Sequence, residues 1–380
     1  MLITCAQLYP LEVPMTKPIR MAGETLTHAQ TLLVRLIDDQ GREGWGEASA
    51  APLMTGETLG SITASTEYLV SKLVGAHVTD PSGIAPLQDR VLYGNASAKS
   101  CHETAIMDLF AQRHRLPMYK LLAGDIGPAG SGRLEMLHML ASGELEGEIE
   151  EALALRREGY RHWKIKVGTG DAANDVRRVR ALCAALQGDV VSADANQSLS
   201  VDEATAIATA GIECGLAFLE QPYRIDMMEA MAALHRDSGL ALCADESIQD
   251  IEDIVEHCST HAAQGVSLKL IKLGGTRPLV HAGRLCLARG MRINLACKVA
   301  ETTISAAATA HAGFALGDIA WGFSMSNRYL AADVCEHPLA PRNGAVTAAQ
   351  FERPGLGFAP EAGRLREFAS ASLSVREFRV

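Results

Sequence analysis

The sequence predicts an α/β protein whose larger part is a parallel β/α barrel and whose first third is a smaller α+β region. Two observations carry this prediction. Beyond residue 132, short apolar segments alternate with helical stretches at a spacing of about 25 residues, which is the length of a βα unit. Eight such apolar segments occur, and eight parallel strands favour a closed ring over an open sheet.

The α+β region comes first in the chain. Residues 1–60 show strand and turn signals, with a strand expected at 32–37 and extended chain again at 44–47, so they predict a small β-meander. From residue 60 to 124 the pattern becomes helical, and residues 105–113 place their large apolar side chains on one stripe.

The barrel strands alternate with helices expected at 148–158, 171–186 and 201–210. The eight expected strands are residues 134–140, 162–167, 190–194, 217–220, 240–245, 266–270, 293–297 and 319–321. The last segment, residues 341–380, holds no further βα unit, and we expect it to return to the first region.

Composition excludes several partners. The formal charge of −10 and the pI near 5.7 leave no broad basic surface, so we expect neither a nucleic acid nor an anionic membrane as partner. The first residues do not resemble a secretory signal, and no run reaches the roughly 20 apolar residues of a membrane span, so a cytoplasmic location is expected. Nine cysteines without a C-x-x-C pair indicate reduced thiols.

Three carboxylates stand at the ends of consecutive expected strands, namely Asp194, Glu220 and Asp245. In a β/α barrel the C-terminal strand ends converge on one mouth, so these residues become neighbours in space. Carboxylate oxygens are the ligands that Mg²⁺ or Mn²⁺ accepts. Each acid alone could merely cap a helix or face solvent, but three in successive βα units favour a metal site.

Lysines flank this expected metal site. Lys164 and Lys166 are two positions apart, so on a strand both side chains point the same way, and the apolar residues beside them favour a buried strand over an edge strand. Repulsion between the two ammonium groups would lower the pKa of one, giving a general base. Lys269 is expected across the barrel from Lys166, whereas Lys272, an odd number of residues further on, should point elsewhere as a solvated or structural residue.

Together these groups suit the chemistry of a carbon next to a carboxylate. A proton at that position is very weakly acidic, and its removal leaves a dianionic enolate. Metal charge stabilises such an enolate while a lysine takes or delivers the proton.

Taken as an ordered set, these residues resemble the enolase superfamily, specifically the muconate lactonizing branch of the mandelate racemase and muconate lactonizing enzymes. The resemblance spans nearly the whole chain. It rests on residues 44–48 (Gly-Trp-Gly-Glu-Ala), Lys164 with Lys166, Asp194 with Asn196, residues 220–222 (Glu-Gln-Pro), residues 244–247 (Ala-Asp-Glu-Ser), residues 268–275 and residues 354–357 (Pro-Gly-Leu-Gly).

The resemblance implies a modified TIM barrel of the (β/α)7β type with an N-terminal α+β capping domain completed by the C-terminal segment. The expected domains are residues 1–125 for the cap, 126–340 for the catalytic barrel and 341–380 for the returning segment. It also implies Mg²⁺ or Mn²⁺ on the three carboxylates, acid/base roles for Lys166 and Lys269, electrostatic help from Lys164, and a homo-oligomer, commonly an octamer in this branch.

Within this branch the chain looks most similar to muconate cycloisomerases, so the expected reaction is a cycloisomerisation of a small carboxylate or dicarboxylate. The mandelate racemase branch expects a histidine paired with an aspartate where this chain has Lys269. Dipeptide epimerases carry a D-x-D pair on the eighth strand, and Asp318 has no such partner. The expected substrate contacts are Arg20, Thr55, Asn196, Lys298, Glu301 and Trp321.

Three alternative hypotheses about function are considered beside the cycloisomerase. The same metal and lysine pair would serve a racemase or epimerase of N-acylamino acids or other amino-acid derivatives. It would also serve a dehydratase of a hydroxy or imino acid. A binding or scaffold protein without catalysis is disfavoured, because all three metal-ligand candidates and both lysines are present.

Overall fold

A barrel of parallel strands forms the larger part of the protein in a computed structural model, which describes residues 1–21, 24–124, 127, 130–299 and 301–380. Its eight strands are hydrogen-bonded in sequence order and every neighbouring pair is parallel. They are β5 (Leu137–Leu140), β6 (His162–Lys166), β7 (Val190–Asp194), β8 (Leu219–Glu220), β9 (Leu242–Ala244), β10 (Gly265–Leu268), β11 (Arg292–Ala296) and β12 (Phe323–Ser324).

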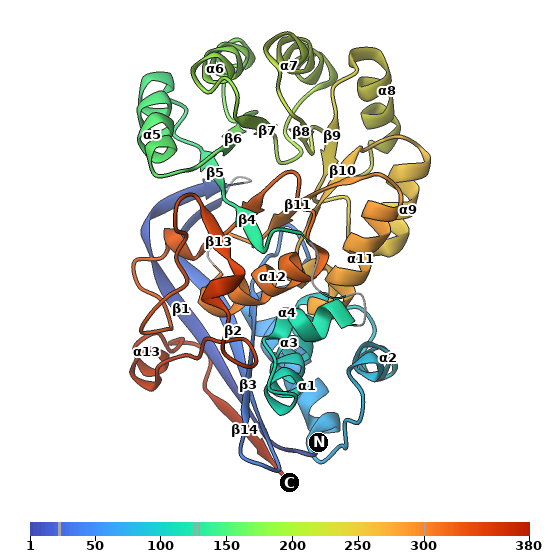
Figure 1. Ribbon diagram of the computed structural model, residues 1–380, viewed down its shortest axis with the longest axis vertical. Helices are drawn as coiled ribbons and strands as arrows, with labels where there is room; N and C mark the ends of the chain where they lie inside the picture. The colour runs from blue at the N-terminus through green and yellow to red at the C-terminus, as the bar shows by residue number, and fades with distance from the viewer. Residues whose placement is uncertain (22–23, 125–126, 128–129, 300) are drawn as a thin grey trace.

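Helices connect these strands on the outside of the sheet (Figure 1). A parallel bridge between Met136 and Phe323 joins the two end strands, so the ring is nearly closed. No described helix follows β12 on the outside of the ring, which gives the expected (β/α)7β order. The outer helices are α5 (Leu145–Arg157), α6 (Ala172–Ala185), α7 (Val201–Cys214), α8 (Met228–Ser238), α9 (Ile251–Ser259), α10 (Leu270–Leu273), α11 (Thr276–Ala288) and α12 (Thr303–Leu316).

The first and last predicted barrel strands need correction. The segment 134–140 is split, because β4 (Arg133–Glu135) pairs with β13 (Ala345–Thr347) in a separate two-stranded sheet and only β5 enters the barrel. The eighth strand begins at Phe323 and not at 319. Gly322 has a φ of 80° and its N–H donates to the carbonyl of Ile319 at 3.1 Å, so the apolar run there is a turn.

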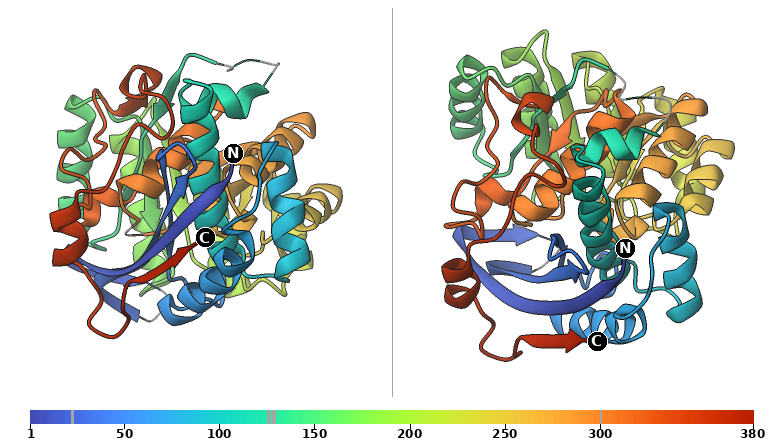
Figure 2. Two further views of the ribbon diagram at one scale, coloured as in Figure 1. Left: turned by 90° about the horizontal axis from the view of Figure 1, so that it is seen from below. Right: turned by 60° about the horizontal axis from the view of Figure 1, so that its bottom comes forward.

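The cap is built on an antiparallel sheet in the order β14-β1-β2-β3. The strands are β1 (Ile3–Met21), β2 (Glu24–Asp38), β3 (Glu43–Ser49) and β14 (Arg376–Arg379). Cys5 of β1 pairs with Arg379 of β14, and the two chain ends lie close together in both views of Figure 2. The predicted return of the C-terminal segment to the cap is therefore confirmed.

The cap helices are α1 (Leu59–Leu73), α2 (Ile84–Val91), α3 (Ala96–Arg113) and α4 (Met118–Ala123). Two of these four, α1 and α3, pack on this sheet, and α4 contacts the barrel helix α12. The helix predicted at 105–113 is part of α3, but it buries more than one stripe. Residues 97–111 are all buried, because α3 lies between the cap strand β3 and the barrel helices α10 and α11. No helix among the described residues combines the length and apolar character needed to cross a membrane, and the nine cysteines are free thiols.

Two buried glutamates of the cap hold the N-terminal ends of barrel helices. Glu47 on β3 accepts hydrogen bonds from the backbone N–H and hydroxyl of Thr302 and from the N–H of Ser305, at the start of α12. Glu103 on α3 accepts from the N–H of Thr276 at 2.7 Å and from the next N–H at 3.1 Å, at the start of α11. The partial positive charge of a helix N-terminus favours these carboxylates, so the cap is fixed to the helices that follow β10 and β11.

The contact between α3 and β3 gives a first testable prediction. A Cβ atom added at Gly46 would lie 1.8 Å from the carbonyl oxygen of Cys101, so Gly46→Ala must push the α3 backbone away from the sheet. We expect a loss of about 3 kcal/mol or more in the free energy of unfolding, at or above the upper end of ordinary overpacking. Urea unfolding measures it. Gly60→Ala, whose Cβ would have no neighbour closer than 3.9 Å, is the control and should not destabilise. Equal stability of both variants would contradict the packing argument.

Candidate functional site

The ionisable residues predicted at the strand ends meet in one cavity of about 80 Å³, which we call the inner cavity. They follow the ring of strands in order. Lys164 and Lys166 lie on β6, Asp194 ends β7, Glu220 ends β8, Asp245 directly follows β9, and Lys269 directly follows β10. Each is buried except Lys166, whose side chain is 15% exposed.

The ring order places the lysines on opposite sides. Strands β6 and β10 are four positions apart in a ring of eight, so Lys166 and Lys269 approach the cavity from opposite walls. The three carboxylates come from the strands between them and occupy one half of the ring. A small molecule bound in this cavity is therefore flanked by an ammonium group on each side.

Each lysine contacts one of the carboxylates. Lys164 donates to Glu220 and, at 3.2 Å, to the side-chain oxygen of Asn294. Lys166 donates to Asp194 and to the side-chain oxygen of Asn196.

The third lysine completes this pattern. Lys269 donates to both oxygens of Asp245. Since all of these groups except Lys166 are buried, the pairs compensate charges that would otherwise be costly to remove from water.

The pairing with carboxylates governs the pKa of Lys164, which shifts in the direction opposite to a lowering by its neighbour. Repulsion between Lys164 and Lys166 was expected to lower the pKa of one of them. Burial does lower the pKa of Lys164, but the nearby Glu220 and Asp194 together outweigh it, so this pKa is raised. For Lys269, burial likewise lowers the pKa and Asp245 leads the effects that raise it above the ordinary value.

Two residues of the cluster were missed from the sequence. Lys272 was expected to be solvated or structural because strand alternation would turn it away from Lys269. The strand ends at Leu268 and α10 begins at Leu270, so alternation does not apply, and the buried Lys272 donates to Asp245 Oδ1 at 2.8 Å. Glu246 is also buried and accepts from Asn196 Nδ2 at 2.9 Å. The only sequence signal for it was its place between Asp245 and Ser247.

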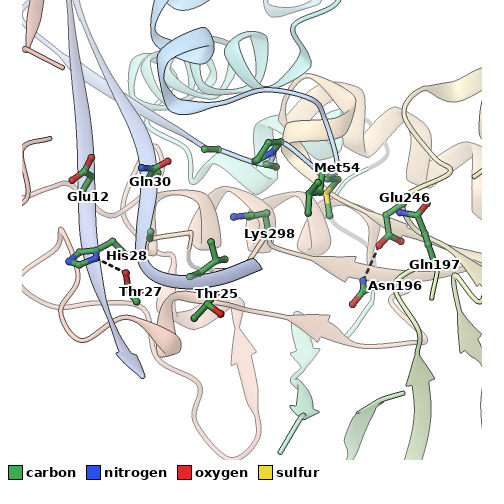
Figure 3. A pocket seen from close by; sticks show the side chains of 16 residues that line it. Glu12, Thr25, Thr27, His28, Gln30, Met54, Asn196, Gln197, Glu246 and Lys298 are labelled. Carbon is green, nitrogen blue, oxygen red and sulfur yellow. Dashed lines mark hydrogen bonds between the residues drawn. The ribbon is translucent and has the colours of Figure 1, made fainter. Parts of the chain in front are cut away.

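A larger cavity of about 520 Å³, the outer cavity, lies between the cap and the mouth of the barrel. Figure 3 shows Glu12, Thr25, His28 and Gln30 of the cap strands on one side of it and Asn196, Gln197 and Glu246 of the barrel on the other. Met54, Asn196 and Lys298 line both cavities, so the two are neighbours. The outer cavity has room for a substrate part that extends beyond the reacting atoms.

Two of the six predicted substrate contacts line the cavities. Asn196 and Lys298 line both cavities. Thr55 does not line either; its hydroxyl accepts from Ser97 at 3.3 Å, and the neighbouring Met54 faces the cavities.

Two further predicted contacts are buried elsewhere, and one is outside the description. Glu301 is buried, and it accepts from the backbone N–H of Lys298 at 3.1 Å without lining the inner or the outer cavity. The ring of Trp321 stacks on Phe218 with centroids 4.0 Å apart, so the structure keeps it in a separate apolar cluster. The side chain of Arg20 lies outside the described residues.

The carboxylates of the inner cavity form a donor set for a divalent cation. Asp194, Glu220 and Asp245 offer hard oxygen ligands from three successive strands of one cavity, as Mg²⁺ or Mn²⁺ requires. Burial and the two neighbouring carboxylates raise the pKa of Glu220, against the lowering effect of Lys164, so added positive charge would be stabilised here. In the present side-chain positions the lysines hold these oxygens, and no three acidic, histidine or cysteine side chains in the described parts of the chain converge on one ion position. The donor chemistry fits.

Comparison with known proteins agrees with this architecture. Residues 6–123 match the mandelate racemase and muconate lactonizing enzyme N-terminal domain, and residues 148–363 match the enolase C-terminal domain-like family. Chloromuconate cycloisomerase from Cupriavidus pinatubonensis is 31% identical over 95% of this chain and 97% of its own length. N-succinyl-L-Arg/Lys racemase from Bacillus cereus is 27% identical over 83% of this chain and 84% of its own.

A solved structure is similar over the whole fold. The muconate lactonizing enzyme from Pseudomonas fluorescens, complexed with muconolactone, has a TM-score of 0.89 at 28% identity, and the match covers 97% of this chain and 99% of that one. Enzymes of the matching family depend on a metal ion and act on small molecules. The chain belongs to the mandelate racemase and muconate lactonizing enzyme family of the enolase superfamily, and it is an isomerase.

Proposed function

We propose that the protein is a divalent-metal-dependent cycloisomerase that closes a muconate-type dicarboxylate to a lactone through an enolate. The observation that carries this proposal is the arrangement of Lys166 and Lys269 on opposite walls of a cavity whose remaining polar lining includes three carboxylates. We also propose that the enzyme acts in the cytoplasm as a homo-oligomer.

The residues of the inner cavity would act as follows. One carboxylate oxygen of the substrate adds to a carbon of the conjugated double bond, a C–O bond forms, and the electron pair moves into the enolate of the other carboxylate. A lysine ammonium then delivers a proton to the enolate carbon, and Lys166 is our first assignment for this donor. Lys269 faces it from the other wall, and Lys164 adds positive charge beside Glu220.

Asp194, Glu220 and Asp245 would hold the cation. When bound, Mg²⁺ or Mn²⁺ supplies positive charge that stabilises the negative charge of the enolate oxygens. Asn196 positions Lys166 through its side-chain oxygen, and Lys298, which lines both cavities, would contact a substrate carboxylate.

A racemase of N-acylamino acids is the second candidate, because a lysine on each side of one carbon also suits removal of a proton from one face and its return to the other. The similarity to an N-succinyl-L-Arg/Lys racemase favours the same alternative. A dehydratase would use the same enolate to expel a β-leaving group.

The position at which deuterium is incorporated from heavy water distinguishes these reactions. We would incubate the Mg²⁺- or Mn²⁺-loaded protein in D₂O with muconates and with N-acylamino acids and follow both by NMR. We expect a lactone that carries one deuterium at the former enolate carbon, and we expect Lys166→Ala not to form it. Lys99→Ala is the matched control, because Lys99 is a buried lysine of α3 whose partner is Asp89 at 2.7 Å.

Other outcomes reassign the reaction. Deuterium at the α-carbon of both enantiomers of an N-acylamino acid, with no lactone from any muconate, would identify a racemase. Absence of exchange with every carboxylate would contradict enolate chemistry itself.

A further inference from the structure

Gln221 is a fully buried side chain that the proposed chemistry does not use, although it directly follows Glu220. Its side-chain oxygen accepts three hydrogen bonds from the segment that follows β9. The donors are the backbone N–H of Asp245 at 2.9 Å, the backbone N–H of Ser247 at 3.2 Å and the hydroxyl of Ser247 at 2.9 Å. Its amide nitrogen donates to the carbonyl of Tyr223 at 3.0 Å, so the orientation of the amide is fixed.

The backbone of Gln221 contacts the segment after the first carboxylate. Its carbonyl oxygen accepts from the N–H of Gln197 at 2.8 Å, three residues beyond Asp194. Its own N–H donates to the carbonyl of Cys243 at 2.9 Å, two residues before Asp245. One residue thus connects the chain segments that carry all three carboxylates.

The backbone at this position is also strained. Gln221 has a φ of 35°, and Asn196 and Gln197 in the neighbouring segment have φ values of 41° and 69°. Left-handed conformations in residues other than glycine cost free energy and persist where the surroundings fix them, and they concentrate at functional sites. Here the hydrogen bonds of the Gln221 side chain and backbone provide that fixation.

We infer that Gln221 is a positioning residue that sets the relative placement of Asp194, Glu220 and Asp245 for a shared divalent cation. It does not line the inner or the outer cavity, so it acts through the carboxylates and not on the substrate. The inference rests on the metal site of the proposed function. Because Gln221 is neutral, its replacement by a neutral residue changes geometry without changing the charge of the site.

The test measures ion affinity directly, without turnover. In Gln221→Met the side chain keeps its approximate length but can no longer accept from Asp245 and Ser247. We expect the dissociation constant for Mn²⁺, followed by electron paramagnetic resonance of the free ion, to rise about 10- to 100-fold, as for other residues that orient metal ligands. Gln221→Asn, which keeps an amide but is one methylene too short, should shift the constant in the same direction and serves if the methionine variant does not fold.

Gln88→Met is the matched control. Gln88 is a fully buried glutamine of α2 whose amide donates to the carbonyl of Lys99 at 2.9 Å, far in sequence from the three carboxylates. This variant should lose thermal stability, as Gln221→Met should, because each removes buried hydrogen bonds, while its Mn²⁺ dissociation constant stays within about twofold of the unmodified protein.

Each outcome decides the inference. Weaker Mn²⁺ binding in folded Gln221 variants, with an unchanged constant in Gln88→Met, supports it. Unchanged binding in a folded Gln221 variant overturns it and leaves the proposed function standing. Failure of the unmodified protein to bind Mn²⁺ overturns both.

Discussion

Lys166→Met should lower kcat for lactone formation about 10²- to 10⁴-fold, the range that a positioned acid or base contributes. The expected loss is in kcat more than in KM, because the ammonium group serves the proton transfer and its contacts in the free protein are to Asp194 and Asn196. Steady-state kinetics at saturating Mg²⁺, with circular dichroism to verify folding, measures this loss.

Lys99→Met is the control, since it also removes a lysine from an ion pair and should leave kcat unchanged. A kcat within tenfold of the unmodified enzyme in Lys166→Met would remove this residue from the mechanism. Lys269→Met, measured in parallel, tests the reaction class. A racemase needs both lysines, one to remove the α-proton and the other to return a proton to the opposite face, whereas lactone formation needs one proton donor.

Glu220→Gln should have the second large effect, on both activity and stability. The carboxylate is buried and lies in the middle of the three ligand candidates. One of its oxygens accepts a hydrogen bond from Lys164, and the other accepts from the hydroxyl of Ser267 at 3.1 Å. Loss of its charge leaves the buried Lys164 without its nearest counter-ion, which costs about 3–5 kcal/mol in the free energy of unfolding. Weakened cation binding should reduce turnover on the order of 10³-fold, equivalent to several kcal/mol of lost charge stabilisation.

Urea unfolding with and without Mg²⁺ separates the two effects. Mg²⁺ should stabilise the unmodified protein and should not stabilise Glu220→Gln at the same concentration. Glu57→Gln is the control, because Glu57 is a buried cap carboxylate that accepts from the N–H of Ser97 at 3.0 Å and does not line the inner cavity. Equal stabilisation of all three proteins by Mg²⁺ would place the ion somewhere else.

Much of the barrel could be predicted from the sequence because its regular parts have local causes. Apolar segments such as 190–194 lie between helices with recognisable starts, for example the capping box formed by Ser200 and Glu203 at α7. The cluster of ionisable residues in the inner cavity was predictable for the same reason: such residues at successive strand ends converge once the ring closes.

The errors occurred where tertiary structure overrides a local pattern. Residues 319–321 have the composition of a strand, but Trp321 stacks on Phe218 and Gly322 turns the chain. Lys272 follows a strand that ends earlier than expected, so a short helix returns its ammonium group to Asp245. Neither the turn at Gly322 nor the short helix changes the spacing of apolar residues, so neither could be found from the periods of two residues for strands and 3.6 residues for helices.

Residues that contact the site from a distance in sequence were also beyond prediction. Met54 lines both cavities because the loop after β3 reaches over the barrel mouth, and nothing in the neighbouring sequence distinguishes it from Thr55. Gln221 stood in a recognised motif, yet its contacts with Asp245 and Ser247 depend on the register of β8 against β9.

The pairing of β14 with β1 has a consequence for synthesis. Residues 376–379 follow every strand of the barrel in the sequence, so a ribosome delivers the whole barrel before the strand that covers the outer edge of β1. Until then this edge presents unpaired N–H and C=O groups, by which strands of separate nascent chains can join. We therefore expect the yield of folded protein in a cell to depend on how well growing chains are kept apart, and to fall when translation is crowded.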